Sequence, residues 1–302
     1  MITAPTSVAA ATAAVPQKPD AASASRRIAF TTPLTYATRL AQRIELRGWA
    51  PYHCPTIMVG PTPRTDSALE AYLLPPCPLL HFCAIAFTSR NGIAAVAQTL
   101  RPDFHPLPPS GEVFIVSALG NDGELLDDAF LSKLCPNPSR LKVLVPPVAT
   151  PAGLVRSLGP GSGRRILCPV PLVVDLEEPP VVPDFLNGLA QNGWDPVRVP
   201  AYETSWAGPK CAEALLELSG ILDAVVFTST AEVEGLLKSL RELGCEWGKV
   251  RERWPEVIVA THGPVTATGA ERLGVDVDVV SRRFGSFEGV VEALESRWTE
   301  RK

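Results

Sequence analysis

The 302-residue sequence lacks the patterns that mark metal-binding, disulfide-rich and membrane-spanning proteins. Its seven cysteines are odd in number and form no C-x-x-C pair, and its four histidines show no metal-ligand spacing. These absences indicate reduced thiols and argue against a zinc site or a disulfide framework. No apolar run approaches the ~20 residues that a membrane-spanning helix needs. The glycine-rich GPGSG at 159–163 precedes a predicted strand instead of following one, so it is not a valid phosphate loop. We therefore expect no metal, no organic cofactor and no membrane span.

An excess of basic residues is also missing. The net charge is −4 and the isoelectric point is near 5.7, which argues against a nucleic-acid partner. The balance does not exclude an anionic small molecule that is held by local amides and a few arginines. Hydrophobic residues make up 46% and charged residues 20%, as in ordinary globular proteins, and the length suits two domains.

Residues 1–26 are rich in Ala, Ser, Thr and Pro and show no apolar periodicity. One interpretation is a disordered terminus. The other, which we favour, is an organelle transit peptide, because such peptides are rich in Ser and poor in acids. Asp20 is the only acidic residue of the segment, and the apolar core of a secretory signal is absent.

One stretch occurs twice and organises the rest of the chain. It reads AIAFTSRNGIAAVAQTL at 84–100 and AVVFTSTAEVEGLLKSL at 224–240, and the two copies align without a gap. Each copy predicts a buried strand, a Thr-Ser turn and an amphipathic helix, which together are half of a βαβ unit. The hydroxyls suit the first residues of a helix, whose free amides also bind anions. We expect the turns to lie at the carboxyl ends of parallel strands, where open α/β sheets bind ligands.

Alternating strands and helices predict a duplicated α/β fold with parallel sheets in two lobes. A third strand–Thr–helix element is predicted at 28–47, and two extended, proline-marked segments flank the central block. We expect the chain to leave its first lobe and return to it. The predicted parts are a first lobe of residues 27–50 plus 204–302, a second lobe of 61–196, and hinge strands at 50–60 and 196–204.

The order of motifs after residue 27 resembles the uroporphyrinogen-III synthase family. The resemblance rests on the opening Thr31-Thr32-Pro33, FTSRNG at 87–92, Leu119-Gly120, PAYET around Tyr202, FTSTAE at 227–232, GPVTATGAERLG at 263–274 and the closing VDVVSRRFGSFEGVVEAL. It implies two α/β lobes joined by a two-stranded β hinge. The chain departs from the family at three sites: Thr32 replaces a usual Arg, GND replaces a GPAT-like sequence at 120–122, and His262 replaces an apolar residue.

The resemblance implies the substrate hydroxymethylbilane, a linear tetrapyrrole with eight carboxylates, and a lyase reaction that loses water and closes the ring with the terminal pyrrole inverted. It also implies a monomer, and a plastid enzyme would account for the N-terminal segment. The alternatives are a non-catalytic tetrapyrrole- or partner-binding member of the same fold and an unrelated two-lobed α/β binding protein.

The resemblance implies Tyr202 as the residue that assists departure of the hydroxyl, and a phenol can donate a hydrogen bond. For Tyr202 the alternative is packing of the hinge, for the Thr-Ser turns it is capping alone, and for Arg90 it is a solvated charge. The expected substrate-binding residues are Thr31, Thr32, Pro33, Thr88, Ser89, Arg90, Asn91, Gly92, Gly120, Thr228, Ser229, Thr230, Gly263, Pro264, Val265 and Thr266.

Overall fold

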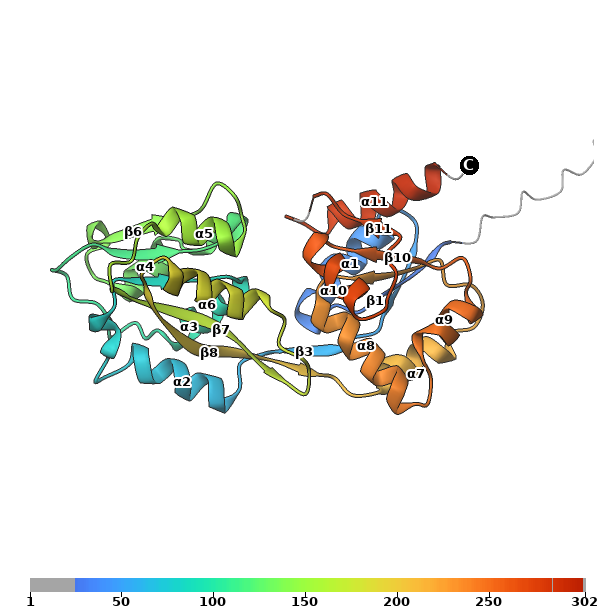
Figure 1. Cartoon of the computed structure of the whole chain (residues 1–302), viewed down its shortest axis with the longest axis horizontal. Coiled ribbons are helices and arrows are strands. Elements are labelled where there is room, and N and C mark those ends of the chain that lie inside the picture. Colours follow the sequence, from blue (N-terminus) through green and yellow to red (C-terminus); the bar gives the residue numbers. More distant parts are fainter. Residues whose placement is uncertain (1–24, 284, 301–302) are drawn as a thin grey trace, which may run out of the picture.

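The protein folds into two α/β lobes joined by a narrow connection (Figure 1). The computed structural model describes residues 25–283 and 285–300. The expected transit peptide falls almost entirely on residues 1–24, which lie outside the described part, so it stays a prediction. Among the described helices, none combines the length and apolar character that crossing a bilayer requires.

The first lobe is built on a five-stranded parallel sheet. Its strands in spatial order are β11 (Val279–Val280), β10 (Ile258–Thr261), β9 (Ala224–Phe227), β1 (Arg27–Phe30) and β2 (Ala50–His53). The run at 275–280 was expected to be one strand, but only its last two residues pair with β10. Alternate residues of the central strands face opposite sides of the sheet, so each strand supplies two cores.

Helices cover both faces of this sheet. On one face Leu40 and Leu294 pack against Phe30 and Val226. On the other face Leu236 and Val250 pack with Phe227 and its neighbours. The helices of this lobe are α1 (Leu34–Glu45), α7 (Lys210–Glu217), α8 (Thr230–Glu242), α9 (Trp247–Arg253), α10 (Pro264–Arg272) and α11 (Glu288–Thr299).

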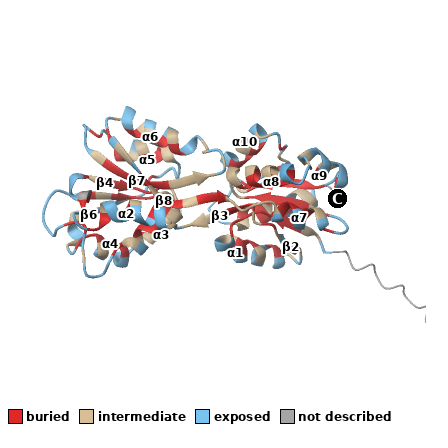
Figure 2. Ribbon diagram, turned by 90° about the horizontal axis from the view of Figure 1, so that it is seen from below, coloured by how far each residue is buried: buried red, intermediate tan, exposed pale blue. Residues whose placement is uncertain are grey.

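The second lobe is built on a six-stranded sheet that is parallel except at one edge. The spatial order is β3 (Ile57–Gly60), β8 (Asp195–Trp206), β7 (Arg165–Val174), β4 (Ala84–Ala86), β5 (Phe114–Ser117) and β6 (Leu141–Leu144). Only β3 runs antiparallel to its neighbour, β8. Buried strands lie in the middle of each lobe, with exposed helix faces around them (Figure 2).

Two helical layers sandwich this sheet as well. On one side of the sheet Leu73, Ile93 and Phe130 pack around Phe87. On the other side Leu154, Phe185 and Leu189 pack with Cys168. The helices are α2 (Pro63–Leu73), α3 (Arg90–Thr99), α4 (Asp128–Leu134), α5 (Pro151–Leu158) and α6 (Val181–Gln191), with short 3₁₀ helices at Pro78–His81, Gly120–Leu125 and Pro138–Arg140.

Two antiparallel strands make the connection between the lobes. Ile57 pairs with Trp206 and Gly60 with Glu203, so β3 extends the far end of β8 toward the first lobe. This confirms the expected fold class. The finer lobe boundaries stay a prediction. Of the segment 50–60, Ala50–His53 pairs with β1 in the first sheet, while Ile57–Gly60 pairs with β8.

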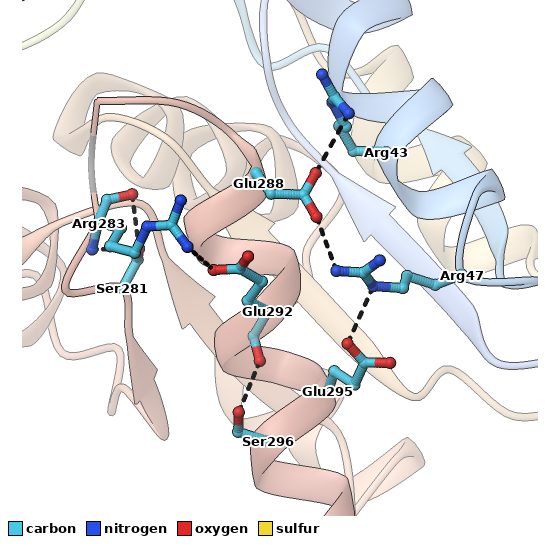
Figure 3. A network of polar contacts seen from close by, with 8 residues as sticks. All are labelled: Arg43, Arg47, Ser281, Arg283, Glu288, Glu292, Glu295 and Ser296. Atoms are coloured by element: carbon cyan, nitrogen blue, oxygen red, sulfur yellow. Dashed lines mark hydrogen bonds and ion pairs between the residues drawn. The ribbon is translucent and has the colours of Figure 1, made fainter.

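A network of ion pairs holds α1 against α11 in the first lobe. The Arg47 guanidinium lies between Glu288, at 2.7 Å, and Glu295, at 3.0 Å, and Arg43 reaches the other oxygen of Glu288 at 3.4 Å (Figure 3). Because α1 is the first and α11 the last of the described helices, this network ties the two ends of the described chain together.

Candidate functional site

A cavity of about 330 Å³ lies between the two lobes. Its walls come from the first turns of α1, α3 and α8, from strands β3, β7 and β8, and from the turns that lead into α6, α10 and α11. The residues that line it are Pro33, Tyr36, Ile57, Val59, Asn91, Pro171, Val173, Pro179, Tyr202, Thr204, Thr228, Ser229, Ala231, Glu232, His262 and Phe287.

The repeated turns build the two sides of this cavity. Ser89 caps α3 by accepting a hydrogen bond from the Gly92 amide at 3.2 Å, and Ser229 caps α8 by accepting one from the Glu232 amide at 3.3 Å. Each turn follows the carboxyl end of a central strand, β4 or β9. The cavity therefore lies where open parallel sheets bind ligands.

Tyr202 lies on β8 with its ring in the cavity wall and only 7% of its surface exposed. Its hydroxyl is 2.9 Å from the Ser89 hydroxyl. Burial raises the pKa of Tyr202 to about 12, although the hydrogen bond with Ser89 acts in the opposite direction. The phenol is therefore neutral at physiological pH and keeps a proton that it can donate.

A second phenol bridges the lobes. Tyr36, on α1, donates a hydrogen bond to the side-chain oxygen of Asn91 at the start of α3. Burial raises the pKa of Tyr36, while the nearby positive charge of Arg90 lowers it. Because Tyr36 belongs to the first lobe and Asn91 to the second, this hydrogen bond spans the cavity.

A smaller hollow of about 220 Å³ adjoins the cavity, and Tyr36, His262 and Phe287 line both. It brings together Arg39 of the first lobe and Arg90 of the second. Arg90 pairs with Asp122 at 3.3 Å. The Arg39 guanidinium lies over the Phe287 ring, 6.0 Å from its centroid, and no described carboxylate forms an ion pair with it. The hollow thus holds one guanidinium, that of Arg39, that no described carboxylate neutralises, beside the Arg90–Asp122 ion pair.

The start of α8 already holds a carboxylate, that of Glu232. This side chain is 1% exposed. One of its oxygens accepts hydrogen bonds from the Thr31 hydroxyl and the Thr228 amide, both at 2.8 Å. The other accepts from the hydroxyls of Thr228 and, at 3.3 Å, Ser229. The amide and both hydroxyls that we expected to bind substrate at 228–229 are thus engaged within the protein.

The opening turn is more buried than its expected role requires. The Thr31 hydroxyl lies within hydrogen-bond distance of the Glu232 carboxylate and the Val226 carbonyl, and it acts as the donor. Thr32 is fully buried, and its hydroxyl has no hydrogen-bond partner among the described residues. Pro33 precedes α1 and is the member of this turn that lines the cavity.

The turn before α10 lies to one side of the cavity. Gly263 precedes the helix, Pro264 is exposed, and the Thr266 hydroxyl donates to the Thr228 carbonyl at 3.2 Å. Val265 is 68% exposed and faces a separate apolar hollow of about 420 Å³ formed with α5 and α6. The residue of this turn that lines the main cavity is the preceding His262.

The remaining expected residues support the turns. Thr230 packs against α10, where a Cβ added to Gly269 would come within 2.1 Å of the Thr230 hydroxyl. Gly92 is buried beneath the Pro169 carbonyl, 3.1 Å from where a Cβ would stand. Thr88 is half-buried. Gly120 has φ of +48° and lies just before Asn121 and Asp122, which line the smaller hollow.

Sequence reasoning did not include Tyr36, Arg39, Glu232 or Phe287 among the site residues. A signal existed for Glu232, because Ser229-Thr230-Ala231-Glu232 fits the S-x-x-E capping box. In the structure, the Glu232 carboxylate reaches the Thr228 amide, one residue before the cap. No comparable signal marks Tyr36, since its partner Asn91 is 55 residues away. In the described part of the chain, no three His, Cys, Asp or Glu side chains gather closely enough to hold a metal ion.

Comparison with known proteins identifies the family of the chain. The sequence profile described as Uroporphyrinogen-III synthase HemD matches residues 139–290, about half of the sequence. A curated relative, the putative uroporphyrinogen-III synthase of Methanothermobacter thermautotrophicus, is 40% identical over 72 residues. That match spans 24% of this chain and 26% of the relative, so the chain aligns with about a quarter of the relative's length.

Solved structures of the same family share the fold. A mutant uroporphyrinogen III synthase from the extremely thermophilic bacterium Thermus thermophilus matches with a TM-score of 0.56 at 18% identity, covering 91% of this chain and 100% of the other. Uroporphyrinogen-III synthetase from Helicobacter pylori matches with a TM-score of 0.51 at 15% identity, covering 92% and 100%. The chain belongs to the uroporphyrinogen-III synthase family.

Proposed function

We propose that the protein is a uroporphyrinogen-III synthase, a lyase that closes hydroxymethylbilane into a ring with the terminal pyrrole inverted and water released. The observation that carries the proposal is the interlobe cavity, which brings Tyr202, Asn91 and Tyr36 to one place from three separate elements. Family membership supports the same reaction.

The geometry suits a reaction in which conformation has to be controlled. Hydroxymethylbilane is a flexible chain that also closes without a catalyst, to the uninverted isomer, so the protein has to hold one folded form of it. That is positioning work. The start of α3 on one side of the cavity and the arginines of the adjoining hollow are groups that hold carboxylates.

Tyr202 is the group that we assign to the leaving hydroxyl. Its phenol is neutral at the working pH, and its hydrogen bond with Ser89 fixes the direction of the oxygen. Donation of a hydrogen bond to the departing hydroxyl would lower the barrier to loss of water. We assign the positioning of carboxylates to the turn at 88–92 and to Arg39 and Arg90.

The direct test is product analysis. The purified protein is incubated with freshly made hydroxymethylbilane, the products are oxidised to porphyrins, and the type I and type III isomers are separated. We expect type III to dominate with the protein and type I without it. A product mixture that is identical with and without the protein would overturn the proposal.

One observation favours a second candidate, a tetrapyrrole-binding member without turnover. The Tyr202 hydroxyl is buried and already bonded to Ser89, and the Thr228 amide and hydroxyl are taken by Glu232. A protein that only binds a tetrapyrrole needs fewer unengaged hydrogen-bonding groups in the cavity than one that also catalyses its cyclisation. Under this alternative, the product quenches or shifts tryptophan fluorescence on binding, while the isomer mixture stays that of the uncatalysed reaction.

A further inference from the structure

The two copies of the repeated turn differ at one chemically decisive position. When FTSRNG is aligned with FTSTAE, Gly92 stands opposite Glu232. The capping serines are equivalent, and so are the threonines that precede them. Only the first-lobe copy carries a carboxylate three residues after its cap.

Glu232 is held as a bound anion would be. Its two oxygens accept four hydrogen bonds, one from an amide and three from hydroxyls. No described Lys or Arg side chain pairs with it, although it is almost fully buried. An unpaired buried charge is costly unless donors converge on it. Burial raises the pKa of Glu232, and the hydrogen bonds from Thr228, Thr31 and Ser229 oppose that rise.

The second-lobe copy uses its hydroxyl differently. Ser89 accepts from the Gly92 amide and bonds to the phenol of Tyr202. Its turn contains no side chain equivalent to the Glu232 carboxylate. The two sides of the cavity are thus unequal: in the first lobe the turn's amide and hydroxyls hold the Glu232 carboxylate, whereas in the second lobe the Asp122 carboxylate pairs with the Arg90 side chain.

We propose that Glu232 is an internal ligand that fills the carboxylate position at the start of α8, and that it thereby determines how a polycarboxylate lies in the cavity. Glu232 is a positioning residue, since it acts through Thr31, Thr228 and Ser229. With this position filled, a substrate carboxylate cannot bind at the first-lobe turn. The orientation of the substrate that would place a carboxylate there is therefore excluded. The second half of this proposal rests on the proposed function, whereas the first half does not.

The first half is tested by chemical rescue of stability. In Glu232→Ala the four donors lose their acceptor, and we expect the melting temperature to fall by about 5 °C or more. Sodium acetate should then occupy the vacated position. With acetate at about tenfold over its Kd, the melting temperature of the variant should rise by about 3–6 °C relative to sodium chloride at the same ionic strength.

Three controls make this test specific. The parent should not respond to acetate, because its site is filled. Glu242→Ala removes an exposed carboxylate from the same helix, so it should not respond either. Glu232→Gln keeps the volume of the side chain, so it should stay folded and leave no room for acetate. If Glu232→Ala folds only when acetate is present, the proposal is supported. A variant that acetate does not stabilise, or does not help to refold, overturns it.

The second half is tested by the isomer ratio. With hydroxymethylbilane and enzyme in excess, Glu232→Ala in chloride should give a type I fraction at least about threefold above that of the parent, and acetate should restore the parent ratio. A rescued melting temperature with an unchanged isomer ratio would overturn the positioning role and leave the internal ligand standing. If the parent itself makes no type III, the proposed function fails, while the acetate result still decides the assignment of Glu232.

Discussion

At the scale of single residues, the cavity contains two phenols in different states. Tyr202 is buried and bonded within its own lobe to Ser89, whereas Tyr36 reaches across to Asn91. A phenol that is buried beside a hydroxyl keeps its proton over a wider pH range than one in water. Tyr202 therefore offers a hydrogen-bond donor at a fixed place in the second lobe. The place of the Tyr36 hydroxyl relative to the second lobe depends on how closely the two lobes approach each other.

We expect Tyr202→Phe to lower kcat about tenfold or less. General acid catalysis contributes about 10²–10⁴-fold where proton transfer is the hard step, but here conformational control is the harder task.

Because the pKa of Tyr202 is raised to about 12, the parent rate should show no decline from this phenol between pH 6 and about 10. Steady-state rates across this pH range measure both effects. Tyr36→Phe is the matched control, because it removes the other phenol of the same cavity. A loss beyond about a thousand-fold in Tyr202→Phe would show that acid catalysis dominates.

The two capping serines allow a paired test of the inequality between the turns. Ser229→Asp places a second carboxylate beside Glu232 and removes one of its donors, so it should destabilise the protein by about 1–3 kcal/mol. Ser89→Asp meets no such neighbour, and Asp caps helices as well as Ser does, so stability should stay within about 0.5 kcal/mol. Urea unfolding of both variants measures the difference. Equal losses would contradict the distinct roles that we give the two turns.

Residue roles were predictable where they depend on local sequence. The serine caps follow from the Thr-Ser turns, and Glu232 could have been found from its spacing to Ser229. The contact between Tyr36 and Asn91 could not, because it depends on how two lobes meet. Thr32 shows a further limit: its place after a central strand predicts the cavity edge, yet its side chain is fully buried in the first lobe.

At the scale of elements, strand and helix order were predictable from periodicity, because most strands are short buried runs and most helices have one apolar face. The prediction that agreed least with the structure was the strand expected at 275–280. Its alternation of Val and Asp is typical of a strand, but the exposed Asp278 accepts a hydrogen bond from the Val259 amide through its side chain, and strand pairing begins only at Val279. Pairing of an edge strand depends on its neighbour as much as on its own sequence.

The pairing of α1 with α11 gives a test at this scale. Arg47→Ala removes both ion pairs of its guanidinium and leaves Glu288 with Arg43 alone. These side chains are partly exposed, so solvent weakens their ion pairs. We therefore expect Arg47→Ala, which breaks most of the network, to lower the free energy of unfolding by about 1–2 kcal/mol. Arg43→Ala, which removes one longer contact, should cost less than about 0.5 kcal/mol. Thermal unfolding at low and at high salt measures both, and the Arg47 effect should shrink as salt rises. An Arg47→Ala protein as stable as the parent would mean that the network contributes nothing.

At the scale of the whole molecule, the lobes touch through few groups besides the connecting strands and the Tyr36–Asn91 hydrogen bond. The Glu177 carboxylate pairs with Arg272 at 3.2 Å, and the Lys238 ammonium donates to the Asp175 carbonyl. Both contacts come from the segment after β7, and both are exposed. Relative motion of lobes is the expectation when an interface is small and polar.

We therefore expect the lobes to approach each other when a tetrapyrrole binds. Small-angle scattering with uroporphyrinogen III at saturation should give a smaller radius of gyration than the free protein at the same ionic strength. The physical reason is that carboxylates of one ligand would contact groups of both lobes, such as Arg39 and Arg90. Scattering curves that superimpose with and without ligand would count against this motion.

The place of β1 has a consequence for how the chain acquires its structure during synthesis. β1 lies between β2 and β9, and Thr31 bonds to Val226, 195 residues later. Every strand of the second sheet, in contrast, lies between Ile57 and Trp206. A growing chain thus completes the second lobe while the first strand still lacks one neighbour, since domains fold as they emerge. Hydrogen exchange on ribosome-bound chains that end near residue 240 should show β4 and β7 protected before β1. Of the described strands, β1 is the first to be made and among the last to be enclosed.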